Sequence, residues 1–108
     1  MPTVNRATAV GASATVTSER IYPQPGHTQI TVYVSAGAAA GLTFRTYAID
    51  PGTGFPSDLD GADQSVSAGG STPRSYQITA PCLEVRVTGL GVTATTTTIS
   101  YETGGVLC

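Results

Sequence analysis

Apolar and polar residues alternate with a period of two along most of this chain, and no other feature constrains the fold as strongly. The chain has 108 residues, of which 18 are Thr and 10 are Val. Both side chains are branched at Cβ and fit well on a pleated sheet. No segment combines the apolar spacing of a helix with helix-forming polar residues between the apolar positions. The sequence therefore predicts an all-β domain with almost no helix.

The alternation divides the chain into short extended segments, each with one face that is suited to a core. The segment Leu42 to Ile49 has bulky groups on both faces, which suits a strand that is covered on two sides. The predicted segments are Thr8 to Val16, Glu19 to Tyr22, Thr28 to Ser35, Leu42 to Ile49, Gln64 to Ser67, Arg74 to Thr79, Cys82 to Leu90 and Thr93 to Tyr101. The side chains expected to face inward are Ile30, Val32, Val34, Tyr76 and Ile78. In the other segments the alternation groups on one face Val10, Ala12, Ala14 and Val16; Leu42, Phe44, Thr46 and Ala48; Leu83, Val85 and Val87; and Thr95, Thr97, Ile99 and Tyr101.

The connections between these segments are rich in small residues, as in an antiparallel domain. Ala36 to Gly41 and Gly89 to Gly91 contain glycines that can take a positive φ. The segment Asp50 to Gly70 is longer, and a loop of such length is usually functional or mobile. Seven to eight short strands at this spacing predict an antiparallel β-sandwich or jelly roll. We expect one such domain over residues 8–103, with an N-terminal arm at 1–7 and a C-terminal tail at 104–108.

The charge pattern excludes several classes of partner. The net charge is −2, and all five basic residues are Arg, scattered along the chain. Binding to nucleic acid or to anionic lipid needs a concentrated basic surface, so we expect neither nucleic acid nor membrane as a partner. The chain has no apolar run of about 18 residues that could span a membrane. Its first residues lack the basic start and apolar stretch of a secretory signal, so we expect a product made in the cytoplasm.

Residues that could carry catalysis are few. His27 is the single histidine, and its place in a turn before a strand indicates a structural residue more than a general base. Asp58, Asp60 and Asp63 crowd one loop, yet no aromatic residue that could grip a sugar flanks them, and the chain has no Trp. No glycine-rich nucleotide motif is present. We therefore expect no enzyme and no cofactor, and we assign no catalytic, cofactor-binding or metal-binding residue.

Calcium binding is the other chemistry that the acidic loop suggests. An EF-hand places acidic ligands at positions 1, 3 and 5, Gly at position 6 and Glu at position 12. Here Gly61 directly follows the second Asp, and Gly69 occupies the twelfth position from Asp58, so the pattern fails. We favour a solvated acidic loop with Asx turns and keep a weak calcium site at Asp58, Asp60 and Asp63 as the alternative.

The two cysteines and the five tyrosines each allow two structural interpretations. Cys82 and Cys108 are interpreted as a buried thiol and a terminal thiol, because a disulfide framework normally uses more cysteines. A bridge between the two is the alternative. The tyrosines are interpreted as core or interface residues with buried rings, and a binding platform is the alternative. They are Tyr22, Tyr33, Tyr47, Tyr76 and Tyr101.

Large apolar side chains are scarce, since Leu, Ile, Val and Phe together number only 22. Strand faces of Thr, Ala and Ser gain little free energy from burial, and edge strands without Lys are poorly guarded against pairing with another chain. A domain of this kind gains stability by burying more surface against copies of itself or against a larger partner. The composition thus indicates a structural subunit that is stable in an assembly.

Five segments together resemble a known family. In order along residues 28–103, they read ITVYVS, LTFRTYAIDPGTGFP, SYQITAP, LEVRVTG and TTTTISYET. This succession resembles the small β-sandwich virion proteins of tailed bacteriophages, which decorate the head or are associated with the tail. The resemblance implies a virion protein that is assembled in the host cytoplasm. It also implies a trimer on the capsid, with the major capsid protein as its partner and an N-terminal arm, here residues 2–6, gripping the shell.

The function expected from the resemblance is that of a capsid decoration (cement) protein, which stabilises the head by protein–protein contacts. A carbohydrate-binding or adhesion module, including a tail-associated receptor-binding domain, is the alternative because it shares the sandwich fold. A small hydrolase is disfavoured, since the chain has neither a second His nor a recognisable nucleophile motif.

Overall fold

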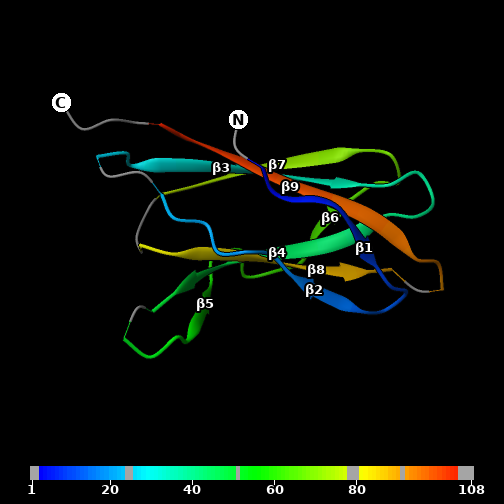
Figure 1. The fold of residues 1–108 in the computed structure, drawn as a ribbon, viewed down its shortest axis with the longest axis horizontal. Coiled ribbons are helices and arrows are strands. Elements are labelled where there is room, and N and C mark those ends of the chain that lie inside the picture. Colours follow the sequence, from blue (N-terminus) through cyan, green and yellow to red (C-terminus); the bar gives the residue numbers. More distant parts are fainter. Residues whose placement is uncertain (1–2, 24–25, 51, 78–80, 91, 105–108) are drawn as a thin grey trace.

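The computed structural model describes residues 3–23, 26–50, 52–77, 81–90 and 92–104. Within these ranges the chain forms strands and no helix. The strands are β1 (Thr3–Val10), β2 (Thr15–Thr17), β3 (Gln29–Ala36), β4 (Leu42–Ile49), β5 (Pro56–Asp58), β6 (Gln64–Val66), β7 (Ser71–Gln77), β8 (Leu83–Gly89) and β9 (Thr95–Gly104). They lie in two layers (Figure 1), which confirms the predicted antiparallel β-sandwich.

Strands that follow one another in the chain mostly lie in different sheets. One sheet has the order β1-β9-β3-β7, and the other has the order β2-β8-β4-β5, with β6 also paired to β4. All of these pairs are antiparallel. The connections β1–β2, β3–β4, β6–β7 and β8–β9 all cross between the sheets at the same end of the sandwich, on the right in Figure 1.

The core lies between the sheets and is built from alternate residues of the central strands. The predicted inward face of β3 is confirmed, because its three apolar residues have no exposed surface, and the alternating apolar residues of β8 and Ile99 of β9 are buried in the same way. Thr95 and Thr97 of β9 are buried beside them. The apolar residues with an exposed fraction of 0% are Val10, Ile21, Ile30, Val32, Val34, Leu42, Leu83, Val85, Val87 and Ile99.

Strand β4 was expected to be covered on two sides, and this expectation is wrong. Leu42, Phe44 and Thr46 face the core and are buried, whereas Arg45 and Tyr47 lie half-buried on the outer face of the sheet. The outer face is bulky because it carries polar groups that contact one another. Bulk on both sides of a strand therefore did not mean a second hydrophobic layer.

The predicted strand from Thr8 to Val16 is also wrong, because two strands of different sheets occupy this stretch. β1 ends at Val10, and a turn follows in which the Ala14 amide donates to the Gly11 carbonyl over 3.0 Å. Ser13 takes a φ of 59° there, and β2 begins at Thr15. The period of two continues through the turn, so alternation alone could not show the break.

The N-terminal arm expected at residues 1–7 is largely part of the sheet. β1 begins at Thr3 and pairs with β9, although its register shifts twice between Thr3 and Thr8. The other edge of this sheet is β7, which contains Pro73 and places Arg74 opposite the buried Val32. Bulges, edge prolines and inward charges hinder pairing with another chain. The two edges of this sheet are therefore better guarded than their lack of Lys suggested.

The remaining differences concern short or weakly patterned strands. β5 has three exposed residues and no alternation, and the sequence did not predict it. β7 begins at Ser71, three residues before the predicted start. Ile78, which was expected to face inward, lies outside the described residues. The isolated bridge from Ile21 to Leu83 agrees with the predicted short extended segment.

A close approach of two backbones generates a first prediction. A Cβ atom added to Gly89 of β8 would collide with the Gly11 carbonyl oxygen, whereas one added to Gly104 of β9 would meet nothing within 4 Å. We expect Gly89→Ala to lower the free energy of unfolding by about 1–3 kcal/mol through overpacking. Gly104→Ala is the matched control and should change it by no more than about 0.5 kcal/mol. Urea denaturation measures both, and equal stability of the two variants would contradict the predicted collision.

Candidate functional site

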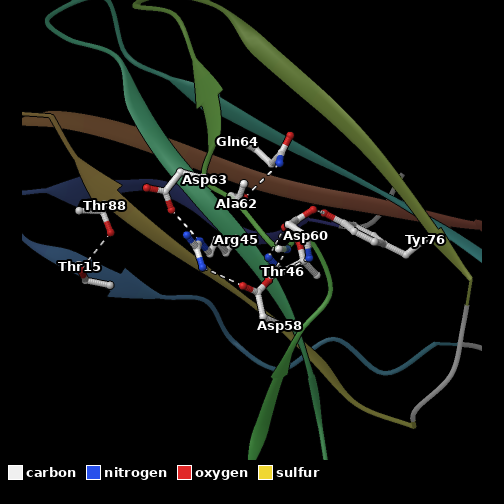
Figure 2. A network of polar contacts seen from close by, with 11 residues as sticks. Thr15, Arg45, Thr46, Asp58, Asp60, Ala62, Asp63, Gln64, Tyr76 and Thr88 are labelled. Atoms are coloured by element: carbon white, nitrogen blue, oxygen red, sulfur yellow. Dashed lines mark hydrogen bonds and ion pairs between the residues drawn. The ribbon is translucent and has the colours of Figure 1, made fainter.

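The acidic loop between β5 and β6 lies against β4; two of its three carboxylates, Asp58 and Asp63, share Arg45 as partner, and the third has other partners (Figure 2). Asp58 accepts a hydrogen bond from Arg45 Nη1 at 2.8 Å, and Asp63 accepts one from Arg45 Nε at 2.7 Å. Asp60 contacts Thr46 and Tyr76 instead. In the described part of the chain, no group of three or more His, Cys, Asp or Glu side chains is arranged to hold a metal ion.

Asp60 is the buried member of the loop, with a side chain that is 0% exposed. Its Oδ2 accepts a hydrogen bond from the Thr46 amide at 2.7 Å, and its Oδ1 accepts one from the Tyr76 hydroxyl at 2.6 Å. Arg74 Nε lies 3.7 Å from Oδ1. Thr46 belongs to one sheet, while Tyr76 and Arg74 belong to the other. The carboxylate therefore ties the two sheets together at this edge.

The position of Thr46 explains why an acidic side chain is needed there. β4 pairs with β6 over residues 42–44 and with β5 over residues 47–49, so no strand pairs with Thr46 on that side. The Asp60 carboxylate satisfies the Thr46 amide, and the Leu59 amide donates to the Thr46 carbonyl over 2.9 Å. A buried backbone amide left without a partner would be costly.

Asp58 forms the Asx turn that was predicted for this loop. Its Oδ1 accepts hydrogen bonds from the amides of Asp60 at 2.9 Å and Gly61 at 3.1 Å. These backbone donors, assisted by Arg45, hold the pKa of Asp58 below its ordinary value. The expected Asx turn is thus confirmed, but the loop is not solvated throughout, because Asp60 is buried.

The tyrosines do not gather into one platform. Tyr22 is exposed, Tyr33 donates to Glu102 at 2.7 Å, and the Tyr47 ring lies under Arg86. Tyr76 and Tyr101 pack against the core, as expected for core tyrosines. Burial, together with the hydrogen bond to a carboxylate, raises the pKa of Tyr76 to about 12.

His27 and Cys82 have structural surroundings. His27 Nδ1 and Thr103 Oγ1 share a hydrogen bond of 2.5 Å, which links the turn before β3 to the end of β9. This contact agrees with the predicted turn residue. Cys82 is buried and has no disulfide partner among the described residues, and Arg20 Nη1 lies 3.9 Å from its sulfur. Cys108 lies outside the described residues, so the interpretation of the two cysteines stays a prediction.

A groove of about 340 Å³ lies on the outer face of β2, β8 and β4. Arg45 and Arg86 stand directly opposite each other across the β4–β8 pair. Like charges in such positions repel unless they are compensated. Arg86 Nε and Nη2 contact Glu84 at 3.0 and 2.8 Å, and its guanidinium lies 4.5 Å from the centre of the Tyr47 ring. The groove is lined by Thr15, Thr43, Phe44, Arg45, Tyr47, Asp63, Arg86 and Thr88.

The sequence analysis did not find this groove. The one sign of the groove in the sequence is that Arg45 and Arg86 lie on the polar faces of two strands that were predicted well. The strands are 41 positions apart, and their register decides that the two arginines meet. Alternation within one strand assigns faces, but it does not determine which residues of two strands lie opposite each other.

A second surface lies at the end of the sandwich where four connections cross between the sheets (Figure 1). We define the uncharged end as residues 11–14, 37–41, 67–70, 90 and 92–94, none of which is charged. Val92 is 96% exposed and Leu90 is 48% exposed. A hollow of about 290 Å³ lies at the same end of the sandwich, lined by Gly37, Ala38, Ala39, Ala94, Thr95 and Thr96. Apolar protrusions and an apolar hollow thus share one end of the molecule.

The described residues include no helix that is long and apolar enough to cross a membrane. No protein-family model matches the chain, and no curated protein matches it in sequence. The function therefore has to be inferred from the geometry of the surfaces together with the resemblance noted in the sequence.

The buried carboxylate generates a second prediction. Asp60→Ala removes the acceptor of the Thr46 amide, so we expect the free energy of unfolding to fall by about 1–3 kcal/mol. Asp63→Ala is the matched control, because that side chain is 62% exposed, and its loss should cost about 1 kcal/mol or less. Chemical denaturation measures the stability of both variants. An equal effect of the two substitutions would contradict the role of Asp60 in linking the two sheets.

The Tyr76 hydroxyl generates a third prediction. Its pKa is about 12 in the folded chain, above the ordinary value of 10.0. Stability from the neutral hydroxyl is therefore fully present below pH 10, and it falls as the pH rises towards 12, because the unfolded chain ionises first. Tyr76→Phe should flatten this alkaline decline in denaturation midpoints. Tyr22→Phe is the control, because the Tyr22 ring is exposed, and this variant should keep the alkaline decline. If the decline persists in Tyr76→Phe, groups other than the Tyr76 hydroxyl cause it.

Proposed function

We propose that this chain is a structural protein of a bacteriophage virion, a capsid decoration protein that stabilises the head by protein–protein contacts. The observation that carries the proposal is the uncharged end, where Val92 is 96% exposed and Leu90 is 48% exposed. Burying such a side chain fully is worth about 1.5–3 kcal/mol. The resemblance of residues 28–103 to small phage virion proteins supports the same function.

The uncharged end is suited to contacts between copies of the chain. Leu90 and Val92 protrude, while the hollow beside Ala38 and Ala94 can receive an apolar side chain. A protrusion of one copy that enters the hollow of the next makes a head-to-tail contact, and such contacts form a ring when the rotation between neighbouring copies closes. We propose a ring of three copies, bound in turn to a larger shell protein such as the major capsid protein.

The proposal does not need a long N-terminal arm. Residues from Thr3 onward belong to β1 and pair with β9, so they are held in the sheet. An arm that grips the shell would have to separate this pair. We therefore assign the contacts with other chains to the uncharged end instead of to residues 2–6.

The test is a double substitution, Leu90→Asp with Val92→Asp, which places charge in the proposed contact. We expect the native chain to be a trimer by light scattering and to cosediment with capsid shells of the phage that encodes it. The double variant should remain folded but lose both properties, because a buried unpaired carboxylate is costly. Phe55→Asp is the control, since Phe55 is 72% exposed on a different connection, and it should behave as the native chain does.

Two results would remove the proposal. One is a native chain that stays monomeric at every concentration and does not cosediment with shells. The other is a double variant that assembles as well as Phe55→Asp does, which would show that the uncharged end makes no contact.

The alternative function, a carbohydrate-binding or adhesion module, depends on a different surface. Its supporting observation is the groove on the outer face of β2, β8 and β4, which is formed by strand residues and not by the connections of the uncharged end, and which carries hydrogen-bonding side chains. A tail-associated receptor-binding domain would combine a virion location with this surface.

A further inference from the structure

We infer that the groove between Thr15, Thr43, Tyr47 and Arg86 is a binding site for an uncharged carbohydrate. The inference does not depend on the virion assignment, because it concerns the sheet face and not the uncharged end. The volume of about 340 Å³ lies at the lower end of the range of small-molecule sites, about 300–1,000 Å³. It therefore suits a short oligosaccharide or the end of a longer chain.

The polar groups of the groove are held in place before any ligand arrives. Arg45 is fixed by Asp58 at 2.8 Å and by Asp63 at 2.7 Å (Figure 2). Arg86 is fixed by Glu84 and by stacking on the Tyr47 ring. Side chains that are already ordered lose less conformational entropy when a ligand binds. The groove is thus better prepared for binding than a surface of freely rotating side chains.

These groups keep hydrogen-bonding capacity after their internal contacts are made. A guanidinium has five N–H donors, and the contacts of Arg45 to Asp58 and Asp63 use two of them. Asp63 is 62% exposed and can accept further bonds. Thr15 and Thr88 present a pair of hydroxyls that are 3.1 Å apart. The groove therefore offers donors and acceptors side by side, as the hydroxyl groups of a sugar require.

The local charge favours an uncharged ligand. Each arginine already contacts at least one carboxylate: Asp58 and Asp63 for Arg45, and Glu84 for Arg86. An anion would have to compete with these carboxylates, and a cation would meet two guanidinium groups. A ligand whose groups both donate and accept, and which carries no net charge, avoids both penalties.

The sheet itself argues against a peptide as the occupant. The backbones of β4 and β8 pair with each other over residues 42–48 and 83–89, and β2 pairs with the other edge of β8. An extended peptide binds by adding main-chain hydrogen bonds at a free sheet edge. Here the groove lies on the face of paired strands, which offers a peptide no row of unpaired main-chain groups.

The test is an NMR titration of the full chain with uncharged oligosaccharides: maltotriose, cellotriose, chitotriose and mannotriose. Sialyllactose and inorganic phosphate serve as the anionic probes. We expect at least one uncharged sugar to shift the resonances of Thr43, Tyr47 and Thr88 at concentrations up to about 10 mM, which fills a site with a Kd of about 1 mM. Arg86→Gln should weaken this binding by about tenfold, because a hydrogen bond from a charged group is lost.

A matched pair of hydroxyl variants separates the groove from the rest of the surface. Thr88→Val breaks the pair with Thr15 inside the groove, and Thr31→Val breaks an equivalent pair with Ser75, 2.9 Å apart, on the outer face of the other sheet. Binding should weaken in Thr88→Val and stay unchanged in Thr31→Val. Shifts with the anionic probes only, no shift with any of the sugars, or equal loss in both variants would overturn the inference. A trimer that binds no sugar would leave the proposed virion function standing.

Discussion

The four central strands β3, β4, β8 and β9 each bury one face against the opposite sheet, and the rest of the structure is placed relative to that contact. The buried side chains are mainly Val, Ile and Leu, which are few in this chain. Threonines complete the inner face of β9, where Thr97 Oγ1 is buried without a hydrogen-bond partner. A core with such members gains less free energy than an all-aliphatic one, so polar contacts at the edges carry more of the stability.

Asp60 is the main contact of that kind. It fills the gap that β5 and β6 leave beside Thr46, and it reaches Tyr76 in the opposite sheet. The same loop supplies the carboxylates that fix Arg45 on the outer face. The acidic loop between β5 and β6, which shows no alternation, therefore has two roles. Asp60 links the two sheets, and the other carboxylates hold Arg45 in place at the groove.

The sequence predicted most of the fold and little of the candidate sites. Strands such as β3 and β8 were found because Ile30, Val32 and Val34, like Leu83, Val85 and Val87, follow the pleat. β5 was missed because all three residues of Pro56–Asp58 are exposed, so the strand shows no alternation. The meeting of Arg45 with Arg86, and the burial of Asp60, depend on contacts between segments far apart in the chain. Local patterns do not contain that information.

The order of strands in the first sheet has a consequence for how the chain is made. β9 lies between β1 and β3, so these two strands are joined in one sheet only after β9 has been synthesised. β1 occupies residues 3–10 and β9 occupies residues 95–104. Their pairing therefore joins a segment that leaves the ribosome early to one that leaves it much later. Closing so long a loop costs chain entropy before the contacts between β1 and β9 can offset that loss. Such a sheet therefore forms late and slowly. β1 therefore stays unpaired while the rest of the chain is synthesised, and during this interval a chaperone or a neighbouring nascent chain has access to it.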